Sequence, residues 1–186
     1  QELQIDIAGD LMGFSAHGRP QILARRPAPA QVEFLGYPGG LGTAFMDYVI
    51  ADATVIPAGD AGSYTESVVR LPHSYLPADD RRVMASDSST RAACGLPHDG
   101  FVFCCFNSHY KISPEVFEVW MQLLNSTPSS VLWLSHGTPE VLSNLRREAG
   151  VRGVDGARLV FAPRLDNSAE HLARYRLADL FLDTLP

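Results

Sequence analysis

The second half of the chain alternates short apolar runs with amphipathic segments. Four runs are rich in aromatic and β-branched residues, which is typical of buried strands: Phe101–Phe106, Val131–Leu134, Leu159–Ala162 and Leu180–Asp183. Helix starts separate them at Ser113-Pro114, at Thr138-Pro139 and near Ser168. Apolar residues of the first helix recur at helical spacing: Val116, Phe117, Trp120, Leu123 and Leu124. This order predicts an α/β fold with a doubly wound parallel sheet.

The first half has strand character with a less regular order. We expect strands at Leu3–Ile7, Gln31–Leu35, Phe45–Ile50 and Val68–Leu71, and short helices at Pro20–Arg26 and Tyr64–Val68. Between residues 73 and 100 the chain becomes polar and rich in proline, which indicates a boundary. The predicted organisation is a first part at 1–77, a linker at 78–99 and a second part at 100–186.

The stretch Phe101–Pro114 holds the one lysine of the chain, Lys111. A strand end before it and a helix start after it place Asn107–Lys111 in a strand-to-helix turn. Open α/β sheets bind ligands at such turns, and the amides at a helix N-terminus favour anions, so a phosphate is the first ligand to expect. The same rim should also receive Ser135-His136-Gly137, Arg164–His171 and Asp183-Thr184.

Residues of this turn also have purely structural interpretations. Lys111 could be a solvated surface charge, but a cation at a helix N-terminus is unfavourable unless an anion lies between them. Tyr110 could pack in the core or stack on a ligand, and Asn107 and Ser108 could satisfy turn backbone groups or bind directly.

Outside the turn, the structural interpretations have more weight. His171 suits a helix surface as well as a contact with ribose or phosphate, and Arg174 could pair with Glu170 at i,i+4 spacing. The glycine-rich loop Gly36–Gly42 fits neither a Walker sequence nor GxGxxG. Its glycines could let backbone amides approach a ligand or could build a tight surface turn, and composition favours the turn.

Composition narrows the classes of function. The 186 residues carry a net charge of −6, and the pI is near 5.4, which argues against a broad nucleic-acid or anionic-membrane surface. No apolar run has the length of a membrane span, so we expect a cytoplasmic protein. Cys94, Cys104 and Cys105 lack metal-ligand spacing, and buried free thiols are expected. The chain begins with Gln1 and stops after a strand, as a piece of a longer polypeptide would.

Several blocks taken together resemble the O-linked N-acetylglucosamine transferase family, and its bacterial branch in particular. They are ARRPAPAQVEFLGYPGGLGTAFMDYVIAD at Ala24–Asp52, YTESVVRLP at Tyr64–Pro72, GFVFCCFNSHYKISPEVFEVWMQLL at Gly100–Leu124, SSVLWL at Ser129–Leu134 and ARLVFAP…EHLARYRLADLFLDT at Ala157–Thr184. The resemblance implies a GT-B architecture, with residues 1–77 from the first, acceptor-side Rossmann-like lobe and 100–186 from the second, nucleotide-sugar lobe, both incomplete here.

The resemblance also implies a reaction. N-acetylglucosamine would pass from UDP-N-acetylglucosamine to a Ser or Thr hydroxyl of a protein, with inversion and without a metal or other cofactor. A tetratricopeptide region would precede the catalytic part, the proposed base histidine would lie upstream of Gln1, and a His-Thr-Thr segment would follow Pro186. The alternatives are a relative with another nucleotide-sugar or acceptor, and a nucleotide-binding scaffold without catalysis.

Site roles follow by motif position. Lys111 matches the lysine that contacts the diphosphate and stabilises the leaving UDP, and Tyr110 matches a tyrosine near the site. Ser108 stands where the family often has a glutamine near the diphosphate, and Ser168 stands where some members have a ribose-binding lysine. The remaining expected positions are Asn107, Leu165, Asp166, His171 and Arg174 for the nucleotide-sugar, and Leu35, Gly36, Pro38 and Gly39 for the sugar and acceptor side.

Overall fold

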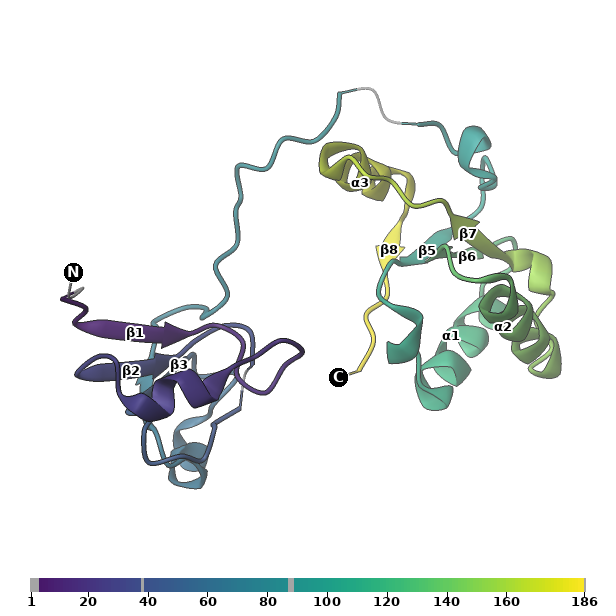
Figure 1. Ribbon diagram of the computed structural model, residues 1–186. Helices are drawn as coiled ribbons and strands as arrows, with labels where there is room; N and C mark the ends of the chain where they lie inside the picture. The colour runs from purple at the N-terminus through teal and green to yellow at the C-terminus, as the bar shows by residue number, and fades with distance from the viewer. Residues whose placement is uncertain (1–3, 38, 87–88, 186) are drawn as a thin grey trace. The chain divides into compact units, whose positions relative to one another are not determined.

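The computed structural model describes residues 4–37, 39–86 and 89–185. The chain divides into two compact units, Gln1–Asp80 and Arg81–Pro186. The division falls inside the predicted linker. Both units are built on parallel sheets, which confirms the predicted α/β class (Figure 1).

The first unit is a four-stranded parallel sheet in the order β1-β2-β3-β4. Its strands are β1 (Ile7–Asp10), β2 (Ala30–Glu33), β3 (Tyr48–Ala51) and β4 (Ser67–Arg70). Its short 3₁₀ helices are η1 (Pro20–Arg25) and η2 (Ala58–Ser63). The helix expected at Tyr64–Val68 is wrong. The buried carboxylate of Glu66 accepts the N–H groups of Leu41 and Gly42, a tertiary contact that accompanies extended backbone leading into β4.

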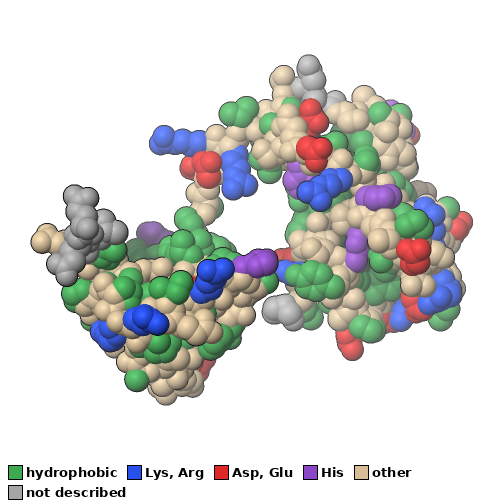
Figure 2. Space-filling view, in the orientation of Figure 1, with side chains coloured by type: hydrophobic (Ala, Val, Ile, Leu, Met, Phe, Trp, Pro, Cys, Tyr) green, Lys and Arg blue, Asp and Glu red, His purple; other side chains and the backbone are tan. Residues whose placement is uncertain are grey.

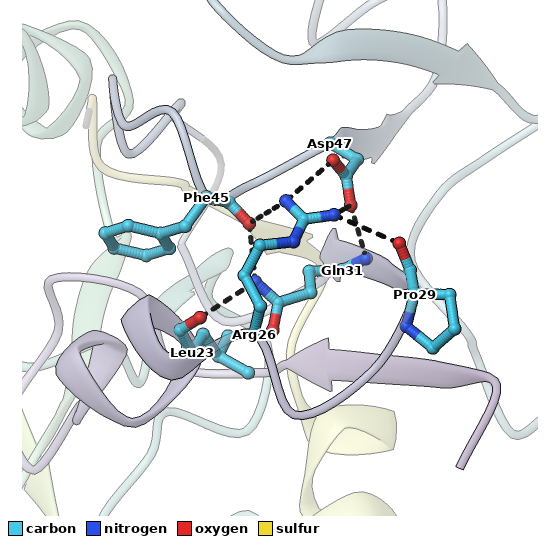
Figure 3. A network of polar contacts seen from close by, with 6 residues as sticks. All are labelled: Leu23, Arg26, Pro29, Gln31, Phe45 and Asp47. Atoms are coloured by element: carbon cyan, nitrogen blue, oxygen red, sulfur yellow. Dashed lines mark hydrogen bonds and ion pairs between the residues drawn. The ribbon is translucent and has the colours of Figure 1, made fainter.

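Arg26 and Gln31 fix the entry to β2 (Figure 3). Arg26 adopts a left-handed φ of 46° and donates to both carboxylate oxygens of Asp47 at 3.1 and 3.0 Å, and to the carbonyl of Pro29. The fully buried Gln31 donates its side-chain amide to the carbonyls of Leu23 and Phe45, while its backbone N–H donates to Asp47. The segment Arg26–Gln31 therefore connects η1, β2 and the residues that precede β3 through side-chain hydrogen bonds.

The second unit follows the predicted strand–helix order. It contains β5 (Val102–Cys105), α1 (Pro114–Ser126), β6 (Val131–Ser135), α2 (Pro139–Val151), β7 (Leu159–Ala162), α3 (Ser168–Arg174) and β8 (Leu180–Phe181). The short 3₁₀ helices are η3 (Ala92–Cys94), η4 (His109–Lys111), η5 (Gly156–Arg158) and η6 (Tyr175–Leu177). The sheet order is β7-β6-β5-β8, and all strands are parallel. Strands β6 and β7 are added on one side of β5, and the chain then returns to place β8 on the other side of β5.

The two faces of this sheet have separate cores. Phe103 and Cys105 of β5 face α1 and α2, where they pack with Phe117 and Trp120. Val102, Cys104 and Trp133 face the other side with Leu96 and residues of η6. Figure 1 shows the same division, with α1 and α2 together and α3 apart from them. Cys104 and Cys105 thus lie on opposite faces as free buried thiols, and burial raises the pKa of Cys104 to about 11.

The segment before β5 is fastened to the second unit by Arg91. Its guanidinium donates to the carbonyls of Leu177 and Gly100 and pairs with Asp179 at 2.8 Å. Ala85 also donates its N–H to the carbonyl of Ala169 in α3. Much of the predicted linker 78–99 is therefore held against the second unit.

Candidate functional site

A cavity of about 550 Å³ lies at the carboxyl ends of β5, β6 and β7, where the sheet rule places ligands. It is lined by Phe106, Ser108, His109, Ser135, His136, Ala162, Pro163, Arg164, Leu165, Asp166, Ser168, His171 and Arg174. The predicted site residues Ser108, Leu165, Asp166, His171 and Arg174 therefore meet in one place. Figure 2 shows histidines together with Lys or Arg side chains on the surface of this unit.

Arg174 is the buried cation of this cavity. Only 7% of it is exposed, its Nη2 donates to the carbonyl of Pro163 at 3.0 Å, and its guanidinium lies 5.4 Å from the centroid of the Phe106 ring and 5.9 Å from that of Trp133. Burial lowers the pKa of Arg174, although the group remains charged near neutrality. Among the described residues it has no ion-pair partner, so the pairing expected with Glu170 is wrong.

His171 lies on α3 beside this arginine. Its ring packs edge-on against Phe106 and Tyr175, with centroid distances of 5.7 and 5.5 Å. Burial first, and the charge of Arg174 second, lower the pKa of His171, so the imidazole is neutral at pH 7. The helix expected to start near Ser168 is capped by Asn167, whose side chain accepts the N–H of Ala169 at 2.9 Å. Ser168 is instead left to line the cavity.

Lys111 lies beside the cavity and not in its wall. It ends η4, whose first residue, His109, does line the cavity. Ser113 caps α1 through the N–H of Val116 and Pro114 follows, as predicted. The Lys111 side chain is exposed and has no hydrogen bond or ion pair with any described residue. Tyr110 is 85% exposed, so its expected alternative of core packing is wrong.

Asn107 links two strand ends. Its side-chain amide donates to Asp183 Oδ1 at 2.7 Å and to Thr184 Oγ1 at 3.0 Å, which ties the end of β5 to the segment after β8. Its carbonyl accepts from the hydroxyl of Ser135 at 3.2 Å, at the end of β6. Asn107 therefore aligns the carboxyl edge of the sheet without lining the cavity itself.

His109 was not among the expected binding residues. Its Nε2 lies 3.0 Å from the carbonyl oxygen of Ser135, so the ring bridges η4 and β6. A Cβ on Gly137 would lie 2.9 Å from the ring of His109, so the glycine leaves room for this contact. The sequence does place His109 in the strand-to-helix turn. Its contact with Ser135 could not be predicted, because the two residues are distant along the chain.

The expected sugar and acceptor residues lie in the first unit, after β2. Leu35 has a left-handed φ of 80°, and a Cβ on Gly36 would lie 1.9 Å from the carbonyl oxygen of Leu11, so only glycine fits there. A Cβ on Gly39 would similarly lie 2.9 Å from the Tyr37 ring. Pro38 lies outside the described residues.

The same edge of the first unit holds a buried carboxyl that sequence reasoning missed. Glu33 ends β2, pairs in register with Asp10 of β1, and is 1% exposed. Neither of its carboxyl oxygens has a hydrogen-bond partner among the described residues. Burial, and then the charges of Glu66 and Asp10, raise the pKa of Glu33 to about 7.

The model for glycosyl transferase family 41 matches residues 2–89 and 87–186. The chain belongs to this family. Similar proteins include the probable UDP-N-acetylglucosamine–peptide N-acetylglucosaminyltransferases SEC of Arabidopsis thaliana, 36% identical over 97% of this chain, and SPINDLY of Oryza sativa, 31% identical over all of it. The chain spans 19% and 20% of these two curated relatives.

A mutant O-GlcNAc transferase from Thermobaculum terrenum has a similar structure. It shares 37% identity and a TM-score of 0.81 over 98% of this chain and 34% of its own. This likeness confirms the expected GT-B class and the expected resemblance to O-GlcNAc transferases.

In the described part of the chain, no three His, Cys, Asp or Glu side chains are grouped so as to hold a metal ion. Nor does any described helix combine the length and apolar character needed to cross a bilayer.

Proposed function

We propose that this chain is part of an enzyme that transfers N-acetylglucosamine from UDP to Ser or Thr hydroxyls of proteins. The observation that carries the proposal is the cavity at the carboxyl edge of β5–β7, with the exposed cation Lys111 in the same short helix, η4, as the lining residue His109. Family membership supplies the reaction class.

In this proposal the nucleoside of the donor occupies the cavity. The neutral ring of His171 offers a flat face, and the guanidinium of Arg174 offers a positive charge. Leu165 and Asp166, from the loop after β7, also line the cavity. A neutral imidazole is suited to a base or ribose contact, while the positive charge of Arg174 adds to the field felt by the phosphates. Ser108 and His109 line the side that leads towards Lys111.

The diphosphate would extend towards η4 and the N-terminus of α1. When the acceptor oxygen attacks the anomeric carbon, the bond from that carbon to the diphosphate oxygen breaks, and negative charge develops on the leaving UDP. Lys111 and the amide dipoles of α1 stabilise that charge, and removal of such a group typically costs about 100- to 1,000-fold in turnover. We propose that the reaction inverts the sugar and requires no metal.

Leu35, Gly36, Pro38 and Gly39 are proposed to face the sugar and the acceptor. A cytoplasmic location and a preceding tetratricopeptide region are further parts of the proposal, and they rest on composition and on the family resemblance.

The test is Lys111→Met in the full-length protein, with Arg147→Met as a matched control on an exposed cation of α2. We expect transfer to fall about 100-fold and UDP affinity, measured by calorimetry, to weaken for the first variant only. Equal behaviour of both variants would contradict the role of Lys111. GDP competing as well as UDP would indicate another donor, and UDP binding without any transfer would indicate a scaffold.

A further inference from the structure

The short helix η4 carries the lysine on which the proposed transfer depends, yet it is a single 3₁₀ turn. Two backbone hydrogen bonds of 3.0 Å define it. The N–H of Lys111 donates to the carbonyl of Ser108, and the N–H of Ile112 donates to the carbonyl of His109. Ser108, at the N-cap position, makes no side-chain capping bond. One uncapped turn is not stable by itself, so contacts with the rest of the unit must hold η4 in place.

His109 makes such a contact at the start of this helix. Its side chain is half-buried, whereas those of Tyr110 and Lys111 are exposed. Its Nε2 lies 3.0 Å from the carbonyl oxygen of Ser135, the last residue of β6. Because a carbonyl oxygen only accepts, Nε2 carries a proton and donates it. One imidazole therefore bonds η4 to the end of an inner strand of the sheet.

The end of β6 fixes this ring and also the backbone before it. The hydroxyl of Ser135 donates to the carbonyl of Asn107 at 3.2 Å. A Cβ on Gly137 would lie 2.9 Å from Cε1 and 3.2 Å from Nδ1 of His109, so the ring packs closely against the chain after β6. The contact of His109 with β6 is thus a close, directional one on both sides.

The side chain of Lys111 has no comparable support. It makes no hydrogen bond or ion pair with any residue that the structure describes, so the backbone of η4 alone sets where its amine can reach. Ile112 packs beside the core and fixes the chain after η4, while His109 fixes it before. Losing the contact of His109 would free the start of the helix, and a displacement of about 1 Å in a catalytic group can cost about 100-fold in rate.

We propose that His109 is a positioning residue for Lys111, and that its bond to Ser135 keeps the lysine amine within reach of the leaving diphosphate. This inference rests on the proposed transfer reaction and adds a residue to it. Both the neutral Nε2–H ring and the imidazolium can donate the bond, so the role does not depend on the charge of the ring.

The first test compares three variants of the full-length protein. His109→Leu fills the space of the ring without a donor, and His109→Gln keeps an N–H that can extend to the same carbonyl. The control is His98→Leu, because that histidine is exposed and pairs with its neighbour Asp99. We expect His109→Leu to lower kcat/KM about tenfold and to weaken UDP, His109→Gln to recover most of this loss, and the control to change neither.

Uridine gives the readout that separates positioning from a damaged cavity. It lacks the phosphates, so we expect it to compete equally well for every variant. A fall in uridine affinity that matches the fall in UDP affinity would overturn the proposal, because it would mean that His109 shapes the cavity or touches the nucleoside. If His109→Leu does not fold, His109→Ala takes its place in each comparison.

A double variant tests whether His109 acts through the lysine. Lys111→Met alone should cost about 100-fold, and adding His109→Leu to it should cost less than about twofold more, because no amine remains to be positioned. Losses that multiply would overturn the positioning role and leave the proposed function intact. Normal transfer by Lys111→Met would overturn the proposed function and this role with it.

Hydrogen exchange of the protein without ligand tests the anchoring by itself. We expect the amides of Lys111 and Ile112, which close η4, to exchange about tenfold faster in His109→Leu than in the unaltered protein. Unchanged exchange would show that His109 does not hold η4 and would overturn the inference, whatever reaction the enzyme performs.

Discussion

Replacing Glu33 by glutamine should stabilise the first unit at alkaline pH. The folded state raises the pKa of this carboxyl from 4.5 to about 7, so it binds more protons than the unfolded state in that window. The free energy of unfolding therefore has its full contribution from Glu33 below pH 4.5, and this contribution falls as the pH rises towards 7. A glutamine side chain has a similar shape but no charge to bury, so the substitution removes the loss.

The size of the effect follows from the shift. At about 1.4 kcal/mol for each pKa unit, the raised pKa of Glu33 lowers the free energy of unfolding by about 3 kcal/mol at pH 8, and by about 1 kcal/mol at pH 5, where only the unfolded state ionises appreciably. The advantage of Glu33→Gln should therefore grow by about 2 kcal/mol between these pH values.

The assay has to report on the first unit. Both tryptophans, Trp120 and Trp133, belong to the second unit, so urea-dependent hydrogen exchange of peptides that cover β2 and β3 is the suitable readout. Asp60→Asn is the matched control, because Asp60 is an exposed carboxylate of η2 in the same unit and is not one of the charges that act on Glu33. A Glu33→Gln advantage that is the same at pH 5 and pH 8 would refute the reasoning.

Other predictions concern both units. Arg158→Met should destabilise the second unit by about 3 kcal/mol, measured by tryptophan fluorescence in urea, because the guanidinium binds the carbonyls of Leu124, Thr127 and Ser130; a loss below about 1 kcal/mol would contradict this. Hydrogen bonds from Arg26 and from the backbone amide of Gln31 lower the pKa of Asp47 in the folded state. Asp47 therefore stabilises the folded state above its unfolded-state pKa, and this stabilisation is lost as the pH falls through its folded-state pKa. Asp47→Asn should remove that acid dependence from hydrogen exchange of β2, and an unchanged profile would count against it.

The pattern of apolar residues predicted the second unit well, for local reasons. The stripe on α1, the Ser113 cap and the uninterrupted apolar β5 agree with one another, so the strand–helix order follows directly. Where the prediction was wrong, the deciding contact was distant in sequence. Glu66 is extended where it reaches the amides of Leu41 and Gly42, which no periodicity at Tyr64–Val68 could reveal.

The candidate site divides in the same way. Its rim was predictable, because the carboxyl ends of parallel strands meet at one edge. The setting of Arg174 was not predictable, since its guanidinium lies over the rings of Trp133 in β6 and of Phe106, the residue after β5, and its spacing to Glu170 suggested a simpler partner. Glu33 was also missed, because an acidic residue in an alternating strand normally faces water.

The single lysine has a practical consequence for chemistry on this chain. Fourteen of its fifteen basic side chains are arginines, whose guanidinium groups do not react as amines under mild conditions. An amine-directed reagent therefore has one side-chain target in these 186 residues, and that target is exposed beside the cavity. A fluorophore or photo-crosslinker attached there would report from beside this cavity without any engineered residue.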